Sequence, residues 1–261
     1  YFFDGRRPAE RYVKDWNWFD DASMKLGVGT YVIHRGDEAF VYDTFPSLPQ
    51  GKFVRAYLEK IVEIARACGA WILCDEVYRG TDQHGDGMTA SIADLYEKGI
   101  STGSMSKTWS LAGLRLGWIV GPADLLHAVS IHRDYNTISV GMLDDHFAAI
   151  ALENRDKILA RSHAITRTNL AILSDWIDGE PLISWIKPRS GTTALLKYEL
   201  PISSEEFCVQ LLERTGVMLT PGSAMDMEGY LRIGYTNDVD VLREGLKRMS
   251  QFLREMQARA A

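Results

Sequence analysis

The residues best suited to chemistry lie between Ser104 and Arg115. The run Ser104-Met105-Ser106-Lys107 places two hydroxyls beside a lysine, and Arg115 follows eight residues after that lysine. A lysine amine attacks an aldehyde only in its unprotonated form, which nearby cations and partial burial favour. Hydroxyls and a guanidinium can bind a dianionic phosphate through charge-assisted hydrogen bonds. The segment therefore indicates carbonyl chemistry on a phosphate-bearing ligand, although a solvated turn with an ordinary lysine is the alternative for so short a motif.

A carboxylate and a phenol follow the apolar run 71–74, at Asp75 and Tyr78. An acid at the C-terminal end of a strand can face a ligand in the crevice at that edge of an α/β sheet. Such an acid could pair with a protonated pyridine nitrogen, which lets the ring accept electrons, and the phenol could hydrogen-bond a ring oxygen. The alternative is an acidic helix cap followed by a core tyrosine.

A scaffold of alternating strands and helices must bring these side chains together. Residues 29–44 alternate as a hairpin does, with a turn at Gly36-Asp37. Apolar residues at helical spacing predict a helix over 53–68, capped by Gly69. Further strands are expected at 71–74, 99–104, 116–120, 182–186, 193–198, 217–220 and 230–235, and further helices at 90–98, 154–178, 203–215 and 238–259. This order predicts an α/β sheet, a long connecting helix and a smaller α+β unit.

Composition limits the partners that we expect for the chain. A net charge of −6 and a pI of about 5.6 provide no electrostatic footprint for nucleic acid or for an anionic membrane. No apolar run approaches the ~20 residues that span a bilayer. The three cysteines match no zinc or disulfide spacing, and the six histidines form no metal motif, so we expect no metal and a cytoplasmic protein.

Taken together, the Asp75 and Lys107 segments resemble the class I and II aminotransferases of pyridoxal-phosphate (PLP) fold type I. The resemblance continues through 110–115 and Pro221-Gly222-Ser223, and it ends at 230–235, which is similar to the small-domain arginine strand of that family. It covers roughly residues 59 to 256. As an ordered set these motifs are highly specific, whereas each alone is weak.

The resemblance implies a role for each matching side chain. Lys107 forms the Schiff base with PLP and moves the proton, Asp75 pairs with the pyridine nitrogen, and Tyr78 binds the 3-oxygen. The remaining implied roles are phosphate binding by Ser104, Ser106 and Arg115 and recognition of the substrate carboxylate by Arg232.

The resemblance also implies a fold and a function. We expect an α/β fold with a partial fold-type-I large domain, built on a mixed sheet with flanking helices, and a small α+β C-terminal domain. The expected parts are an atypical N-terminal segment at 1–58, the partial PLP-binding domain at 59–153, the connecting helix at 154–178 and the small domain at 179–261. The implied function is amino-group transfer between an amino acid and a 2-oxo acid, in amino acid metabolism, by a cytoplasmic homodimer.

Other features depart from the family. Family members normally begin with more than a hundred residues that have no counterpart here, and 45–51 lacks the family's asparagine. The chain is therefore expected to be incomplete or a splice of two fragments. Residues 20–58 weakly resemble the opening hairpin of a metallo-β-lactamase-like hydrolase. Two alternatives to the aminotransferase follow, a PLP-binding or dimerising module without turnover and a fragment of such a hydrolase, the second disfavoured because its metal motif is absent.

Overall fold

The computed structural model describes residues 29–35, 38–44 and 50–260 of the 261-residue chain. The chain forms two compact units, 1–159 and 160–261. The boundary between them falls within the long helix α7, Arg155–Asp178.

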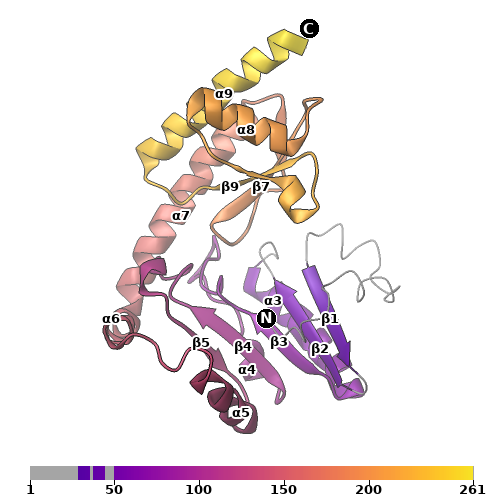
Figure 1. Ribbon diagram of the computed structural model, residues 1–261, viewed down its shortest axis with the longest axis vertical. Helices are drawn as coiled ribbons and strands as arrows, with labels where there is room; N and C mark the ends of the chain where they lie inside the picture. The colour runs from indigo at the N-terminus through magenta and orange to yellow at the C-terminus, as the bar shows by residue number, and fades with distance from the viewer. Residues whose placement is uncertain (1–28, 36–37, 45–49, 261) are drawn as a thin grey trace. The chain divides into compact units, whose positions relative to one another are not determined.

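The first unit contains a mixed five-stranded sheet in the order β1-β2-β3-β4-β5 (Figure 1). Strands β2, β3 and β4 are parallel neighbours, whereas the two edge strands, β1 and β5, run antiparallel to β2 and β4. The pairing of β1 with β2 confirms the predicted hairpin, although its turn at Gly36-Asp37 lies outside the described residues. The strands are β1 Gly29–Arg35, β2 Glu38–Thr44, β3 Trp71–Asp75, β4 Gly99–Ser104 and β5 Gly117–Val120.

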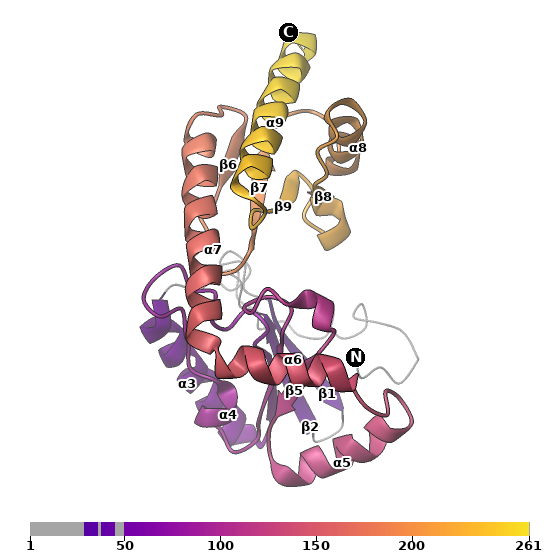
Figure 2. The same cartoon turned by 90° about the vertical axis from the view of Figure 1, so that its left-hand side faces the viewer.

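Helices α3 and α6 pack on this sheet through buried apolar or small residues. Helix α3, Gln50–Cys68, buries Leu58, Val62 and Ala65 in one cluster with Ile72 and Cys74 of β3. A second cluster joins Met105 and Trp109 to small residues of α6. Figure 2 shows α6 in front of the strands, with α3 and α4 behind and beside them. The other helices of this unit are α4 Ile92–Leu95, α5 Ala123–Asp134 and α6 Met142–Glu153.

The second unit is an antiparallel sheet in the order β6-β7-β9-β8, with a single core shared by its strands and helices. Burial alternates along β7 and β9, as expected where one face of a strand meets helices and the other does not. Phe207, Leu231 and Phe252 lie at the centre of this core and are almost fully buried. The elements are β6 Ile183–Trp185, β7 Thr193–Tyr198, α8 Ser204–Thr215, β8 Thr220–Pro221, β9 Tyr230–Gly234 and α9 Val239–Ala260.

The Pro221-Gly222-Ser223 segment is tied to the start of α8. A Cβ on Gly222 would overlap the carbonyl oxygen of Met227, so the close turn requires glycine. The amide of Ser223 donates to Ser204 Oγ at 3.0 Å, and that hydroxyl donates to Glu228 at 2.9 Å. The Ser204 amide also donates to Glu228, at 2.5 Å, and these bonds lower the pKa of the Glu228 carboxyl.

Most predicted elements are confirmed within one or two residues, whereas two predictions are wrong in extent and two helices were missed. The helix expected at 90–98 contains only α4, because Tyr96 adopts an extended conformation. The strand expected at 217–220 pairs only at its end, as β8. Helices α5 and α6 were not predicted, since many of their apolar residues are exposed and follow no single stripe.

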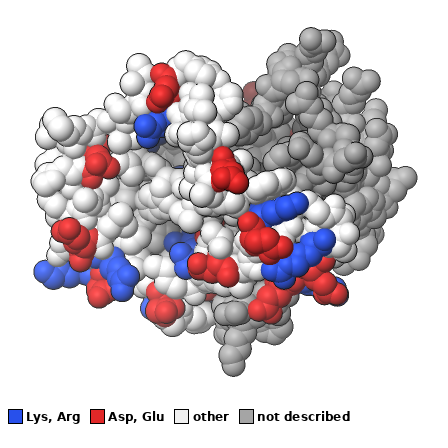
Figure 3. Space-filling model, turned by 90° about the horizontal axis from the view of Figure 1, so that it is seen from below, with Lys and Arg blue, Asp and Glu red and all other residues white. Residues whose placement is uncertain are grey.

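The described surface carries charges of both signs. Acidic and basic side chains are interspersed over the described part of the face drawn in Figure 3. Interactions between exposed charges that lie farther apart than the Debye length, about 10 Å at 0.1 M salt, are largely screened. Among the residues that the structure describes, no helix is both long and apolar enough to cross a bilayer.

Candidate active site

The parallel pairing of β3 and β4 brings the two predicted motifs to one edge of the sheet. Parallel strands end at the same edge, and the register places Asp75 opposite Thr102, two residues before Ser104. The bond from the Glu76 amide to the Thr102 carbonyl, 2.8 Å, continues this pairing beyond the strand. Asp75 and the lysine segment, 32 residues apart in sequence, are therefore neighbours in space.

The lysine lies in a tight turn after β4 that is anchored on both sides. Met105 is completely buried, and its amide donates to the Leu116 carbonyl at 3.0 Å. The Leu111 amide donates in turn to the Met105 carbonyl at 2.9 Å, which closes the loop. The Ser106 amide donates to Ser104 Oγ at 3.3 Å, so the two predicted serines lie in contact.

Arg115 reaches the same edge by a different route. Strand β5 runs antiparallel to β4 and pairs Gly117 with Ser104, so the residues just before β5 lie beside the end of β4. Arg115 has a left-handed backbone, with φ +47°, and its Nη1 donates to the Ala112 carbonyl at 2.8 Å. This arginine is exposed, and it lies at the edge that carries both serines.

Tyr78 and Lys107 meet directly. Tyr78 lies in the turn that follows β3, and Lys107 Nζ is 5.8 Å from the centroid of its ring. This distance is typical of a cation–π contact. Asp75 shapes the start of that turn, because its Oδ1 accepts a hydrogen bond from the Val77 amide at 3.1 Å.

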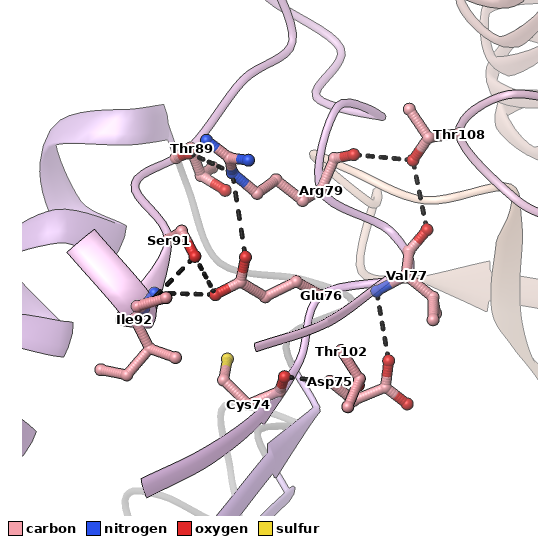
Figure 4. Close-up of polar contacts among 11 residues, drawn as sticks. Cys74, Asp75, Glu76, Val77, Arg79, Thr89, Ser91, Ile92, Thr102 and Thr108 are labelled. Atoms are coloured by element: carbon pink, nitrogen blue, oxygen red, sulfur yellow. Dashed lines mark hydrogen bonds and ion pairs between the residues drawn. The ribbon is translucent and has the colours of Figure 1, made fainter. Parts of the chain in front are cut away.

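Glu76, which sequence reasoning did not single out, fastens this turn to α4 (Figure 4). Its Oε1 accepts hydrogen bonds from the Ile92 amide at 2.8 Å and from Ser91 Oγ at 3.1 Å. Its Oε2 lies 3.9 Å from Arg79 Nε, which itself donates to the Thr89 carbonyl at 2.7 Å. The Glu76 side chain is only 7% exposed. A buried carboxylate requires hydrogen-bond partners, and these partners come from other loops, so the sequence offered no signal for Glu76.

Thr108 is a second residue that the sequence motifs did not identify. Its hydroxyl lies 2.7 Å from the Arg79 carbonyl and 3.2 Å from the Val77 carbonyl (Figure 4). The residue next to the lysine is thus hydrogen-bonded to the two residues that flank Tyr78.

Arg232 belongs to the second unit, where it lies on β9 between Leu231 and Ile233. Both neighbours are buried in the core, so the alternation of the strand directs Arg232 to the opposite, exposed face. Its Nη2 donates to Thr220 Oγ1 of β8 at 3.3 Å.

The groups at the edge of the first sheet fit PLP by their chemistry. An amine, a carboxylate and a phenol lie together, as a carbonyl carbon, a pyridine nitrogen and a ring oxygen require. The hydroxyls of Ser104, at the end of β4, and Ser106, just after it, lie near the guanidinium of Arg115 before β5, as phosphate binding requires. Among the residues whose positions are described, no three His, Cys, Asp or Glu side chains cluster as metal ligands would.

Comparison with known proteins agrees with this chemistry. The family model for aminotransferase class I and II matches residues 34–249. Capreomycidine synthase of Streptomyces vinaceus is 33% identical over 155 residues, which are 59% of this chain and 40% of that protein. An aspartate aminotransferase of Streptomyces avermitilis is 28% identical over 226 residues, which are 80% of this chain and 55% of that protein.

A solved structure shares the fold. The crystal structure of a PLP-dependent aminotransferase from Streptococcus suis is 42% identical, with a TM-score of 0.74, and the match covers 77% of this chain and 53% of that one. The chain thus spans about half the length of the relatives that it matches.

These matches correct one expectation and confirm others. The family match begins at residue 34, inside the hairpin, and β2 pairs with β3 in the same sheet, so the resemblance of 20–58 to a hydrolase finds no support. The predicted α/β fold of type I is confirmed, and the family and its structures imply PLP as the cofactor. The chain belongs to the class I and II aminotransferases.

Proposed function

We propose that the protein transfers an amino group between an amino acid and a 2-oxo acid with PLP. One observation carries the proposal: the parallel pairing of β3 and β4 places Asp75, Tyr78 and Lys107 at one sheet edge, with Lys107 Nζ 5.8 Å from the tyrosine ring. Sequence motifs alone leave open whether an acid and a lysine 32 residues apart ever meet.

Each of these three side chains has a distinct task in the proposal. Bound PLP would supply an electron sink for a carbanion at the substrate Cα. Lys107 is the covalent anchor, and its amine removes and returns the Cα proton when substrate has displaced it. Asp75 keeps the pyridine nitrogen protonated, and the Tyr78 phenol donates a hydrogen bond to the 3-oxygen.

The remaining predicted residues bind anionic groups. Ser104, Ser106 and Arg115 hold the phosphate, since they lie where β4 ends and β5 begins. Arg232 pairs with the α-carboxylate of the substrate, because a guanidinium on an exposed strand face can form a planar, bidentate pair.

Departures from the family pattern predict weak cofactor binding by the 261-residue chain. Neither the family's phosphate-binding turn nor its stacking aromatic has a counterpart here, and residues 45–51 contain no asparagine. Two or three missing hydrogen bonds to a charged group, at ~1.5–3 kcal/mol each, would weaken binding by several orders of magnitude. Unless residues 1–50 or a partner chain supply these contacts, we expect PLP to be lost on dialysis and turnover of the 261-residue chain to lie near background.

Borohydride reduction of PLP-treated protein tests the proposal. Peptide mapping should find the fixed label on Lys107, and Lys107→Arg should abolish it while retaining the positive charge. Lys60 is a suitable internal reference, since it is an exposed helix lysine paired with Glu63. A label shared evenly between Lys107 and lysines such as Lys60 would refute the assignment.

Asp75→Asn separates cofactor binding from chemistry. With PLP in excess, this variant should still be labelled at Lys107 but should exchange the Cα proton of bound amino acids more slowly than the wild type at the same PLP concentration, since each ~1.4 kcal/mol of lost stabilisation is tenfold in rate. Exchange at the wild-type rate would contradict the role of Asp75.

Two other functions remain as candidates, each with its own assay. The similarity to capreomycidine synthase favours a synthase as one alternative, which an assay would recognise by consumption of an amino acid without formation of a 2-oxo acid. A PLP-binding or dimerising module would be labelled at Lys107 yet turn over no amino donor. The proposed homodimer would appear as a doubled mass in sedimentation equilibrium.

A further inference from the structure

We propose that Thr108 is a positioning residue for Lys107. Its hydroxyl fastens residues 105–111, the lysine turn, to residues 76–81, the tyrosine turn. The proposal rests on the proposed function, because positioning matters only if Lys107 is the reacting amine. The Thr108 side chain is only 2% exposed, and none of its hydrogen bonds to described residues is made to the side chains of Asp75, Tyr78 or Lys107.

The hydroxyl of Thr108 reaches two carbonyls that flank Tyr78. Its Oγ1 lies 2.7 Å from the Arg79 oxygen and 3.2 Å from the Val77 oxygen. Figure 4 shows this hydroxyl between the two backbone oxygens, on the opposite side of the turn from the Glu76 network. A single side chain thus bridges two loops that are about thirty residues apart in sequence.

The methyl group of Thr108 also packs closely against the tyrosine turn, at Gly80. Gly80 has φ +100°, a conformation that L side chains rarely adopt, and a Cβ there would lie 2.5 Å from Thr108 Cγ2. Glycine at position 80 therefore permits the close approach of the two turns. The methyl group faces this glycine while the hydroxyl faces the carbonyls, so the threonine side chain contacts the tyrosine turn with both of its branches.

This contact constrains the backbone from which the lysine side chain extends. Lys107 lies between Thr108, held by the tyrosine turn, and the loop anchored by the fully buried Met105. Its own side chain is exposed, so burial does not hold it in place. Because the backbone of Lys107 is held in place, its amine stays within a limited volume near Tyr78. Misplacement of a reacting group by about 1 Å can cost ~100-fold in rate.

Amide hydrogen exchange on the chain without cofactor tests the contact itself. Thr108→Val keeps the shape but removes the hydroxyl, and it should speed exchange in both 76–81 and 105–111 by roughly tenfold. Thr108→Ser keeps the hydroxyl and should stay near wild type. Thr166→Val is a matched control, since Thr166 is 5% exposed and its hydroxyl lies within 3.2 Å of two helical carbonyls in the second unit.

The share of PLP that borohydride reduction attaches to Lys107 reports how well its amine is positioned. With PLP and borohydride, Thr108→Val should lower the ratio of label on Lys107 to label on Lys60 by roughly tenfold. Thr108→Ser should restore the ratio, and Thr166→Val should leave it unchanged. If Thr108→Val fails to fold, Thr108→Ala removes the same hydroxyl without placing a methyl group against the carbonyls.

Each outcome decides the proposal. A wild-type label ratio in a folded variant without the hydroxyl would overturn it. A label ratio in Thr108→Ser as low as in Thr108→Val would overturn it too, because a hydroxyl at position 108 would then not restore the position of Lys107. Exchange that accelerates in only one of the two segments would show that the turns are not coupled. A wild-type chain with no preference for Lys107 would instead refute the proposed function, while the exchange result would still decide whether Thr108 joins the two turns.

Discussion

Removing the Glu76 carboxylate should destabilise the first unit by about 3 kcal/mol. The side chain is 7% exposed and accepts hydrogen bonds from the Ile92 amide and from Ser91 Oγ. A hydrogen bond to a charged group contributes ~1.5–3 kcal/mol, so Glu76→Ala loses about 3 kcal/mol at the lower limit. The ion pair adds little to this figure, because Arg79 is 38% exposed and its nearest approach is 3.9 Å.

Glu76→Gln should cost less, about 1–2 kcal/mol, because the amide oxygen can still accept from the Ile92 amide. The new NH₂ group would face Arg79 Nε, so two donors would meet where an acid and a guanidinium now lie. The order Ala, Gln, wild type in increasing stability is therefore part of the prediction.

Hydrogen exchange measured across a urea series provides the assay, because it reports each unit separately. Protection of β3 and α4 gives the stability of the first unit, and peptides from α9 provide an internal reference in the second. Glu199→Gln is the control, since Glu199 is 57% exposed and pairs with the exposed Lys197, so its loss should cost under ~0.5 kcal/mol. A loss below about 0.5 kcal/mol for Glu76→Ala would refute the reasoning, because a buried acceptor with two donors cannot be so dispensable.

Three further predictions concern the second unit and the cysteines. Arg232→Lys should weaken amino-acid binding roughly tenfold, since an ammonium cannot form the planar fork, and titration of PLP-loaded protein measures it; unchanged affinity for every amino acid tested would count against the role. The bonds from Ser204 lower the pKa of Glu228, so this acid stabilises the fold above its ordinary value of 4.5 and the contribution is lost as pH falls through the lower, folded value. Glu228→Gln should therefore flatten the fall in melting temperature between about pH 5 and 3. The same fall in melting temperature as in the wild type would contradict this. Burial raises the pKa of Cys208 to about 11, so iodoacetamide at pH 8 should alkylate the exposed Cys68 first and Cys208 only on unfolding, as mass spectrometry of the labelled peptides would show.

Local pattern was sufficient to predict most elements of the fold. Period-2 alternation predicted the hairpin strands β1 and β2. Helical periodicity predicted α3, α7 and α9, because each of these helices buries apolar residues on one face. Helices α5 and α6 were not predicted, because their exposed apolar residues mark no single buried face. The proposed division at 58, 153 and 178 stays a prediction.

The sequence by itself determined which chemical groups the site contains. Ser104, Ser106, Lys107 and Arg115 were identifiable because the chemistry requires these residue types at close spacing, and the family resemblance supplied their roles. The spacing alone could not show that these residues lie near Asp75. That proximity depends on the parallel pairing of β3 with β4, a contact between segments distant in sequence.

Tertiary structure alone decided how these groups are held. Glu76 and Thr108 carry no motif, because a glutamate and a threonine have many uses and only their partners distinguish them. Those partners, Ile92 for the acid and the carbonyls of Val77 and Arg79 for the hydroxyl, come from other loops of the fold. Chemistry is carried by residue type, which the sequence displays, whereas positioning is carried by hydrogen bonds between loops, which exist only once the chain has folded.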